Sequence, residues 1–543
     1  MDELESILRR ARTSRLDEKD CAKIKAVFES YLYLTNLLED KATTIDRLRK
    51  LLFGAGSEKT RDVIPSRAEP PSTVTEEAEP PLSKRPGHGR NGVDAYEGAT
   101  KIPVAHESLK SGDGCPECRK GKVYELAQPG VLVRITGQAP VQAKVYELQR
   151  LRCNLCGKVF TAAAPQGVGT EKYDATAASM IALLKYGSGL PFNRVEGLQG
   201  SLGIPLPAST QWDIVRDTAA VVTPVYEELV RQAAQGEVLH NDDTTMKILE
   251  LMGKRAKARA LAGDAPERAR DASRRKGIFT SGVISTKEGR TIALFFTGRK
   301  HAGENLAEVL AHRAAALGPP IQMCDALSRN LPGELKTVLG HCLAHGRRQF
   351  VDVAQRFPEE CRHLLETLRD VYRNDEAAKE RNLSPGERLS FHQAESGPLM
   401  VELKAWLHRQ FEERLVEPNS ALGEAISYML NHWEKLTLFL RQPGAPLDNN
   451  VCERALKKAI LHRKNALFYK TENGAHVGDL FMSLIYTCQL GGVDPFDYLT
   501  ALQRHATELA SDPARWMPWN YRNEPRTRNG GAATARAPGH VQT

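Results

Sequence analysis

The stretch Glu237-Val-Leu-His-Asn-Asp-Asp-Thr-Thr-Met-Lys-Ile-Leu249 decides the fold, because it is a short apolar run with two adjacent acids, Asp242 and Asp243, in its middle. A carboxylate in a half-buried strand is unfavourable unless a cation or hydrogen-bond donors compensate it. The stretch therefore indicates either a functional site or a strand that ends in an Asp-Asp-Thr turn. The sequence that follows favours the site.

Further strands and a helix are predicted directly downstream. A strand, a second strand, a helix and another strand are expected at Gly277–Ile284, Thr291–Phe296, Gly303–Ala316 and Pro320–Asp325. Three successive strands, a helix and a strand are how a ribonuclease-H-like core begins. In that fold Asp242 and Asp325 would lie on neighbouring central strands. A fifth strand is expected at Thr337–His345.

A third acid, Glu453, stands near the start of a later predicted helix. Asn450 followed three residues later by Glu453 is a capping-box pattern that needs no function. Leu456 and Ile460 follow at helical spacing, however, so Glu453 is expected on the buried stripe of the helix. This position favours a role at a site.

Asp242, Asp325 and Glu453 together offer hard oxygen ligands, which suit magnesium better than zinc. Two Mg²⁺ or Mn²⁺ ions can activate the attacking oxygen and steady the leaving oxygen of a phosphodiester. Water as the nucleophile would cleave a strand, and a freed 3′-hydroxyl would join it to another DNA. His345 and Arg348 could steady the phosphate or the carboxylates, or serve only as surface residues.

Charge and composition indicate a polyanionic partner. The 543 residues contain 75 Lys and Arg against 67 Asp and Glu, and residues 254–276 hold nine basic residues against three acids. Each basic cluster alone could be a solvated face. The chain has neither a signal peptide nor a membrane-spanning run, so a cytoplasmic, nucleoid-associated protein is expected, with no membrane partner.

Four of the ten cysteines form two C-x-x-C pairs and predict a structural zinc site with all four positions filled by protein. The alternative is four reduced thiols without metal. The ligands would be Cys115, Cys118, Cys153 and Cys156. The other six cysteines are scattered through the sequence at Cys21, Cys324, Cys342, Cys361, Cys452 and Cys488.

The N-terminal region contains four heptads, in which eight of nine core positions are apolar and Lys41 is the polar exception. This pattern predicts a coiled coil and self-association, the alternative being an amphipathic helix packed on its own domain. Further on, helices are expected at Ala177–Tyr186, Phe192–Leu202 and Ser209–Ala234. The last two resemble a helix-turn-helix, although hairpins that only pack are equally common.

Eight segments result from these patterns. They are a coiled-coil helix (1–55), a Pro-rich linker (56–96), a zinc ribbon (97–165), a helical DNA-binding segment (170–235), the first part of the ribonuclease-H-like core (236–340), an all-α insertion (341–445), the last part of the core with C-terminal helices (446–505) and a flexible tail (506–543). The expected fold class is thus a multidomain α/β protein.

Nine short signatures occur in an order that resembles the transposases of the insertion sequence sixty-six family, from about Asp20 to Leu502. After the heptads they are Leu52 to Lys59, His88 to Arg90, the two C-x-x-C pairs, Asp242-Asp-Thr244, Asp325, Ala344-His-Gly-Arg-Arg348, Asp448-Asn-Asn-x-x-Glu-Arg454, Arg463-Lys-Asn465 and Pro495-x-x-Tyr-Leu499. Asp243 stands where relatives commonly carry Glu, which favours Asp242 as the ligand. Ala326-Leu327 replaces the Gly-Tyr of many relatives.

This resemblance implies a bacterial DDE transposase in which Asp242, Asp325 and Glu453 match the catalytic triad. Such an enzyme binds the terminal inverted repeats, cleaves the ends and joins them to target DNA, and small accessory proteins are plausible partners. The basic residues expected to bind DNA are Arg347, Arg348, Arg454, Lys457, Arg463 and Lys464, and those expected to support the acids are Asp243, His345 and Asn449. The alternatives are an inactive zinc-ribbon DNA-binding protein or repressor, and a ribonuclease-H-like nuclease without strand transfer.

Overall fold

The computed structural model describes residues 104, 108–124, 126, 138–152, 154, 156, 159–167, 169, 171–252 and 277–523. The predicted coiled coil, Pro-rich linker, basic loop at 254–276 and last twenty residues lie outside this part of the chain. Contacts divide the chain into two compact units, residues 67–142 and the described residues from 143 onward. Each unit is considered by itself.

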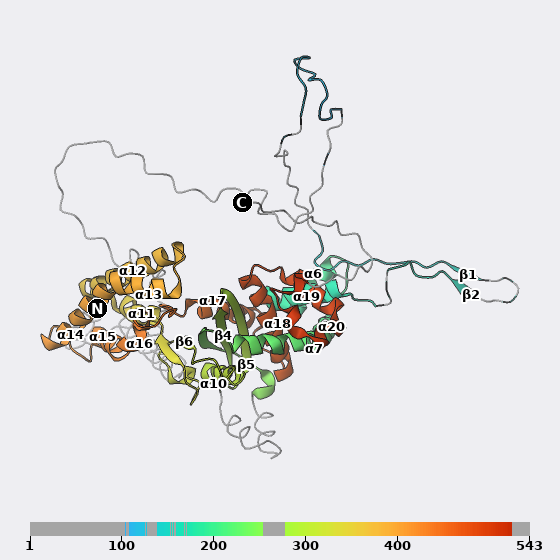
Figure 1. Cartoon of the computed structure of the whole chain (residues 1–543). Coiled ribbons are helices and arrows are strands. Elements are labelled where there is room, and N and C mark those ends of the chain that lie inside the picture. The colour runs from blue at the N-terminus through green and yellow to red at the C-terminus, as the bar shows by residue number, and fades with distance from the viewer. Residues whose placement is uncertain are drawn as a thin grey trace, which may run out of the picture. The chain divides into compact units, whose positions relative to one another are not determined.

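A five-stranded mixed sheet is the centre of the larger unit (Figure 1). Its strands are β3 (Val238–Thr245), β4 (Phe279–Lys287), β5 (Arg290–Gly298), β6 (Ile321–Cys324) and β7 (Val338–His341). The spatial order is β5-β4-β3-β6-β7, with antiparallel pairs from β5 to β3 and parallel pairs from β3 to β7. The predicted strands exist, but the fifth ends at His341 rather than His345, because helix α11 starts at Leu343.

Helices cover both faces of this sheet. Successive residues of a strand point to opposite faces, so neighbouring residues of β4 contact helices on different sides. On one face, Ser281 accepts a hydrogen bond from Asn305 of α10 (Ala302–Leu310), and Ser285 donates one to Ala233 of α7 (Ala208–Ala233). On the other face, Gly282 lies under α17 (Asn450–Ala466). The fold is therefore α/β with flanking helices.

Helix α18 (Glu472–Leu490) lies along β5 and accepts hydrogen bonds from its backbone. The acceptors are four residues apart, so they lie on one face of the helix. The donors are two residues apart, so they lie on one side of the strand. The N–H groups of Ala293, Phe295 and Thr297 donate to Thr487 Oγ1, Ser483 Oγ and Asp479 Oδ2 at 3.1, 3.0 and 2.6 Å.

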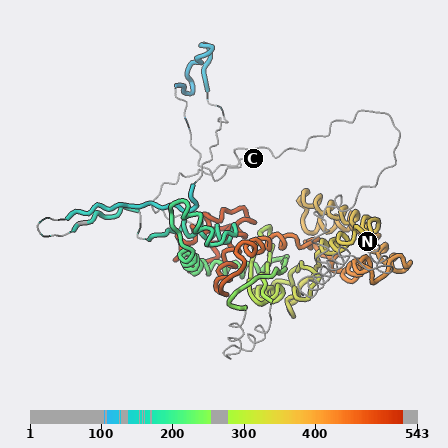
Figure 2. Tube along the Cα trace, turned by 180° about the vertical axis from the view of Figure 1, so that it is seen from behind, coloured from blue at the N-terminus to red at the C-terminus, as the bar shows by residue number. Residues whose placement is uncertain are grey.

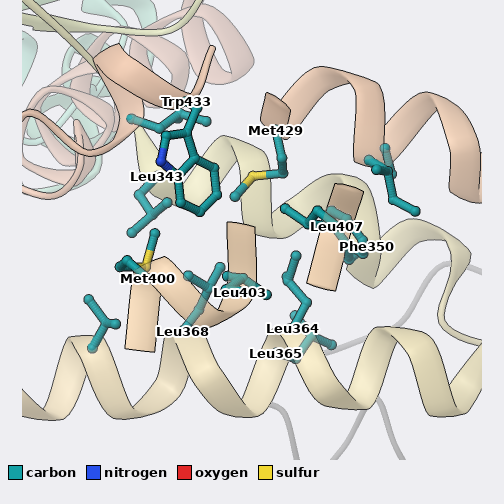
Figure 3. Close-up of a cluster of buried hydrophobic side chains, with 14 of the residues drawn as sticks. Leu343, Phe350, Leu364, Leu365, Leu368, Met400, Leu403, Leu407, Met429 and Trp433 are labelled. Atoms are coloured by element: carbon teal, nitrogen blue, oxygen red, sulfur yellow. The ribbon is translucent and has the colours of Figure 1, made fainter. Parts of the chain in front are cut away.

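Between β7 and α17 the chain forms a group of helices beside the sheet, as both views show (Figure 1, Figure 2). They are α11 (Leu343–Val353), α12 (Pro358–Glu380), α13 (Pro385–Glu395), α14 (Gly397–Glu412), α15 (Ala421–Asn431) and the short α16 (Trp433–Leu436). The apolar faces of all of these helices except α13 meet in one core that includes Phe350, Leu364, Leu403, Met429 and Trp433 (Figure 3).

The helices before the sheet are α5 (Ala175–Ala182), which continues as a π-helical turn to Gly187, α6 (Phe192–Ser201) and α7. Gln211 is fully buried and its amide donates to the carbonyls of Phe192 and Leu206, which fixes the turn between α6 and α7. Trp212, at the start of α7, lies beside Gly474 of α18. The predicted helices are present, and this end of α7 is partly used for packing.

After α18 the described chain continues with α19 (Pro495–Arg504), α20 (Ala506–Ser511) and two short 3-10 helices at Pro513–Trp516 and Tyr521–Asn523. Leu509, Trp516 and Tyr521 are buried, so ordered structure continues past residue 505, where the flexible tail was expected to begin. The antiparallel pair β1 (Arg150–Arg152) and β2 (Val159–Thr161) precedes all of these helices. Over the described residues, every helix is too short or too polar to cross a bilayer.

Candidate active site

Asp242 and Asp325 lie at the same end of two adjacent parallel strands. The pairing of β3 with β6 runs from Val238 with Ile321 to His240 with Met323, and each aspartate follows two residues after the last pair. Burial, followed by the negative charge of Asp325, raises the pKa of Asp242 to about 7. Asp243 and Glu453 add to this repulsion. Acids that are far apart in the sequence therefore interact electrostatically in the folded chain.

Asn449 positions the helix that carries Glu453. It is fully buried at the N-cap of α17, its Nδ2 donates to the carbonyl of Asn241 at 3.1 Å, and its Oδ1 lies 3.1 Å from His240 Nδ1. The capping box expected from Asn450 and Glu453 is not formed, because the side chain of Asn450 donates to Asp448. Glu453 therefore stands one turn beyond a residue anchored to β3.

The close approach of α17 to the sheet depends on Gly282, which pairs with Asp242 across β3 and β4. A Cβ atom at Gly282 would lie 3.2 Å from Leu456 and 3.3 Å from Cys452. Cys452, Leu456 and Ala459 form the buried side of the helix. Glu453 lies at the margin of this stripe, with its side chain 27% exposed, rather than at its centre.

The carboxylate of Glu453 is turned toward α11. Its Oε1 lies 3.7 Å from His345 Nε2, and its Oε2 lies 3.8 Å from Arg348. Oε1 of Glu453 and Nδ1 of His345 are both buried without a hydrogen-bond partner. Among the described residues, the group that brings three ligand atoms within 4.8 Å of one another is Cys342, His345 and Glu453, not the three acids.

Two neighbouring acidic groups have partners that short motifs did not reveal. Asp243, whose side chain is 2% exposed, lies 2.9 Å from His301 Nδ1 and 3.4 Å from Arg329. Asp325 accepts a hydrogen bond from the amide of Asn330. Asp243 is thus paired with two basic side chains, whereas Asp242 Oδ1 accepts a hydrogen bond only from the N–H of Asp243, at 2.8 Å, among the described residues.

The basic residues singled out in the sequence fall into two groups. Arg454, Lys457 and Lys464 are exposed at helical spacing along α17. Arg463 instead holds the end of β3, with Nη1 3.2 Å from Thr244 Oγ1. Arg347 and Arg348 are half-buried on α11; Arg348 faces Glu453, as above.

Cys115 and Cys118 share one tight turn in the smaller unit. The N–H of Arg119 donates to the carbonyl of Cys115 at 2.9 Å, and the N–H of Gly121 donates to Cys118 Sγ at 3.4 Å. N–H groups of Lys120 and Gly121, then Cys115, lower the pKa of the Cys118 thiol. Cys153 lies outside the described residues, so four-cysteine ligation stays a prediction.

The chain is thus an α/β protein with a mixed sheet, and two of its carboxylates lie at the same end of adjacent strands. Residues 172–477 match the family model described as Transposase IS66 family. This match covers 306 of 543 residues, more than half, so the chain belongs to that family. Membership of this family indicates a transposase, which is a class of DNA-processing enzyme.

Two relatives from Sinorhizobium fredii (strain NBRC 101917 / NGR234) extend the similarity. The uncharacterized protein y4jD is 25% identical over 509 residues, which cover 90% of this chain and 96% of the relative. The uncharacterized protein y4hP is 27% identical over 433 residues, covering 75% of this chain and 73% of the relative. Similarity to y4jD therefore extends well beyond the 306 residues of the family match.

Proposed function

We propose that the chain is a DDE transposase that binds the terminal inverted repeats of its insertion sequence, cleaves the DNA ends and joins the 3′-hydroxyl ends to target DNA. The observation that carries this proposal is that Asp325, from the strand next to β3, and Glu453, from α17, lie near enough to Asp242 to add to the effect of burial in raising its pKa. The family membership supports it independently.

The topology of the sheet supports a ribonuclease-H-like core. Three antiparallel strands followed in space by two parallel strands, in the order β5-β4-β3-β6-β7, agree with the arrangement expected from the sequence. The first two acids then come from the central strand and its parallel neighbour. The helical group at residues 343–440 separates them from the helix that supplies the third.

The donor set fits hard divalent cations. All three residues offer carboxylate oxygens, and Oε1 of Glu453 lacks a hydrogen-bond partner. Burial and then the neighbouring negative charges raise the pKa of Asp242, and a bound cation would oppose both effects. When bound, a pair of Mg²⁺ or Mn²⁺ ions would activate the attacking oxygen and steady the leaving oxygen of the phosphodiester.

The protein's own residues hold these ligands in place. Asn330 orients Asp325, Asn449 fixes the start of α17 against β3, and His301 with Arg329 keeps Asp243 apart. The exposed basic stripe of α17 begins next to Glu453 and would hold DNA phosphates beside the acids. A zinc ribbon at Cys115, Cys118, Cys153 and Cys156 and oligomers formed through residues 1–55, with accessory proteins as further partners, complete the proposal.

Cleavage of labelled duplexes that carry the two ends of the insertion sequence tests this function. Wild-type protein with Mg²⁺ is expected to cut at the 3′ ends, and Asp325→Ala to lose at least about 100-fold in rate, because an entire metal ligand is removed. The matched control is Glu395→Gln, an exposed acid at the end of α13, which should cut like wild type. Equal cleavage by Asp325→Ala and wild type would refute the role of Asp325.

A sulfur substitution asks whether Asp325 acts through a metal. Asp325→Cys should be inactive with Mg²⁺ and regain activity with Mn²⁺, which accepts a thiolate ligand more readily than Mg²⁺ does. Cleavage without joining of the ends would favour the nuclease alternative. Binding of the ends with no cleavage by wild type in either metal would favour the repressor alternative.

A further inference from the structure

A second group of possible metal ligands includes Glu453, one of the three acids, together with two residues at the start of α11. Cys342 is the N-cap of α11, His345 lies one turn along it, and Glu453 reaches them from α17. One ligand atom from each residue lies within 4.8 Å of the other two. The 3.7 Å between His345 Nε2 and Glu453 Oε1 is a few tenths of an ångström longer than the roughly 3.3–3.5 Å that separates a nitrogen and an oxygen ligand of a tetrahedral zinc ion, so a small side-chain movement would close the site.

One unsatisfied atom of this cluster points to a missing partner. Glu453 Oε1 is buried without a hydrogen-bond partner. Buried polar atoms are rarely left unpaired, since each costs roughly 1–3 kcal/mol. A cation between the three side chains would satisfy the carboxylate oxygen and use Nε2 of His345.

Two features beside Cys342 would stabilise a metal-bound thiolate against the effect of burial. The N–H of Asn449 donates to its sulfur at 3.2 Å, and its position at the N-terminus of a helix of 11 residues stabilises negative charge. Burial keeps the free thiol protonated, so binding would release its proton to solvent. Sulfur, imidazole and carboxylate together suit zinc or another borderline transition metal, not magnesium.

We infer that Cys342, His345 and Glu453 form a binding site for one zinc-class transition-metal ion, whose occupation holds the Glu453 carboxylate on α11. Three protein ligands leave the fourth position open. On the proposed function, Glu453 is also a ligand of the catalytic cations, so the two uses of this side chain compete. Micromolar Zn²⁺ would then inhibit cleavage supported by Mg²⁺.

Co²⁺ replaces Zn²⁺ as a coloured probe and tests binding without any DNA reaction. Full-length protein, supplied first with one equivalent of Zn²⁺ for the predicted ribbon, is titrated with Co²⁺. Wild type should show a sulfur-to-cobalt charge-transfer band and the visible bands of four-coordinate Co²⁺. Cys342→Ser should lose the charge-transfer band, and His345→Gln should weaken Co²⁺ binding at least about tenfold, since each lacks one of three ligands.

The matched control is Cys361→Ser, which changes another buried thiol, on α12, and should titrate like wild type. Thermal unfolding of each variant verifies that it is folded, and His345→Gln provides the answer if Cys342→Ser is not. Identical spectra for wild type and both cluster variants would overturn the site. Failure of the enzyme to cut DNA would leave this spectroscopic result intact, so the two proposals fail separately.

Inhibition is then measured relative to the rate of each protein without Zn²⁺. Wild type and Cys361→Ser should lose Mg²⁺-supported cleavage in the concentration range where Zn²⁺ displaces Co²⁺ from the cluster. Cys342→Ser should need at least about tenfold more Zn²⁺ for the same loss. Equal inhibition of Cys342→Ser and wild type would overturn the competition for Glu453.

Discussion

At the scale of single residues, the proposed function needs Asp242 as a carboxylate, but ionising this buried side chain lowers the stability of the fold. In the folded chain its pKa is raised to about 7 from an ordinary value of 3.8, by burial and by the charge of Asp325. At a pH between these two pKa values, Asp242 is therefore protonated in the folded state and ionised in the unfolded state. Stability from this group falls as the pH rises from about 4 to about 7 and is constant above that.

Asp242→Asn should accordingly stabilise the protein in buffer without divalent cations, because an amide cannot ionise. The gain in unfolding free energy should be larger at pH 8 than at pH 5 by roughly 2.7 kcal/mol, which is about 1.36 kcal/mol for each of the two pH units between 5 and 7. Urea unfolding at the two pH values measures it, and added Mg²⁺ should reduce the gain at pH 8.

Asp243→Asn is the matched control for Asp242→Asn, because its side chain is paired with His301 and Arg329. Removing that charge leaves two basic groups without their partner, so this variant should be destabilised at pH 8. A gain for Asp242→Asn of the same size at both pH values would contradict the raised pKa.

At the scale of elements, the contact between α18 and β5 depends on polar side chains as much as on apolar ones. Asp479 accepts both the N–H and the hydroxyl of Thr297 while 3% exposed. Burial raises the pKa of Asp479 to about 7, against the opposing effect of these two hydrogen bonds. The helix and strand are thus joined at a buried carboxyl.

Asp479→Ala should lower the unfolding free energy by about 2–4 kcal/mol, because two buried donors lose their acceptor. Asn473→Ala, an exposed change on the first turn of α18, should stay within about 0.5 kcal/mol of wild type. Both values come from urea titrations monitored by tryptophan fluorescence. A loss for Asp479→Ala no larger than that for Asn473→Ala would show that the carboxyl is not needed there.

Elements and acids differ in how far the sequence determines them. The strands around Asp242 and Asp325 were predictable, since each is a short apolar run, with Asp242 inside the first and Asp325 at the end of the second, which is a local pattern. The boundary at His341 was not, because Cys342 to His345 is apolar enough for a strand, and only packing of α11 against the other helices ends it. Local periodicity has no information on that packing.

The direction of Glu453 was only partly predictable for the same reason. Its stripe on the helix follows from Leu456, but its orientation toward α11 depends on Asn449, which reaches more than two hundred residues back to Asn241. Cys342 was treated as one of six scattered cysteines. Its spacing of three from His345 at the start of a helix, a spacing at which two metal ligands share one face, was the available signal.

For the whole molecule, the basic stripe of α17 sets where DNA would lie relative to the acids. Lys457→Ala should weaken binding of end duplexes and reduce the slope of log K against log salt by about 1, since one phosphate contact is lost. Fluorescence anisotropy over a range of salt concentrations measures both. Arg409→Ala, an exposed change on α14 away from this stripe, is the control. An unchanged slope for Lys457→Ala would place the DNA elsewhere.

The hydrogen bonds from α18 to β5 also limit how copies of the chain can assemble. Every second N–H along the outer side of this strand, from Ala293 to Thr297, is already bonded to a side chain of the helix. A strand from a neighbouring molecule could add there only after a docked helix of 19 residues had been displaced. Association by continuing the sheet at β5 is thereby prevented, so any oligomer of this chain must form through other surfaces.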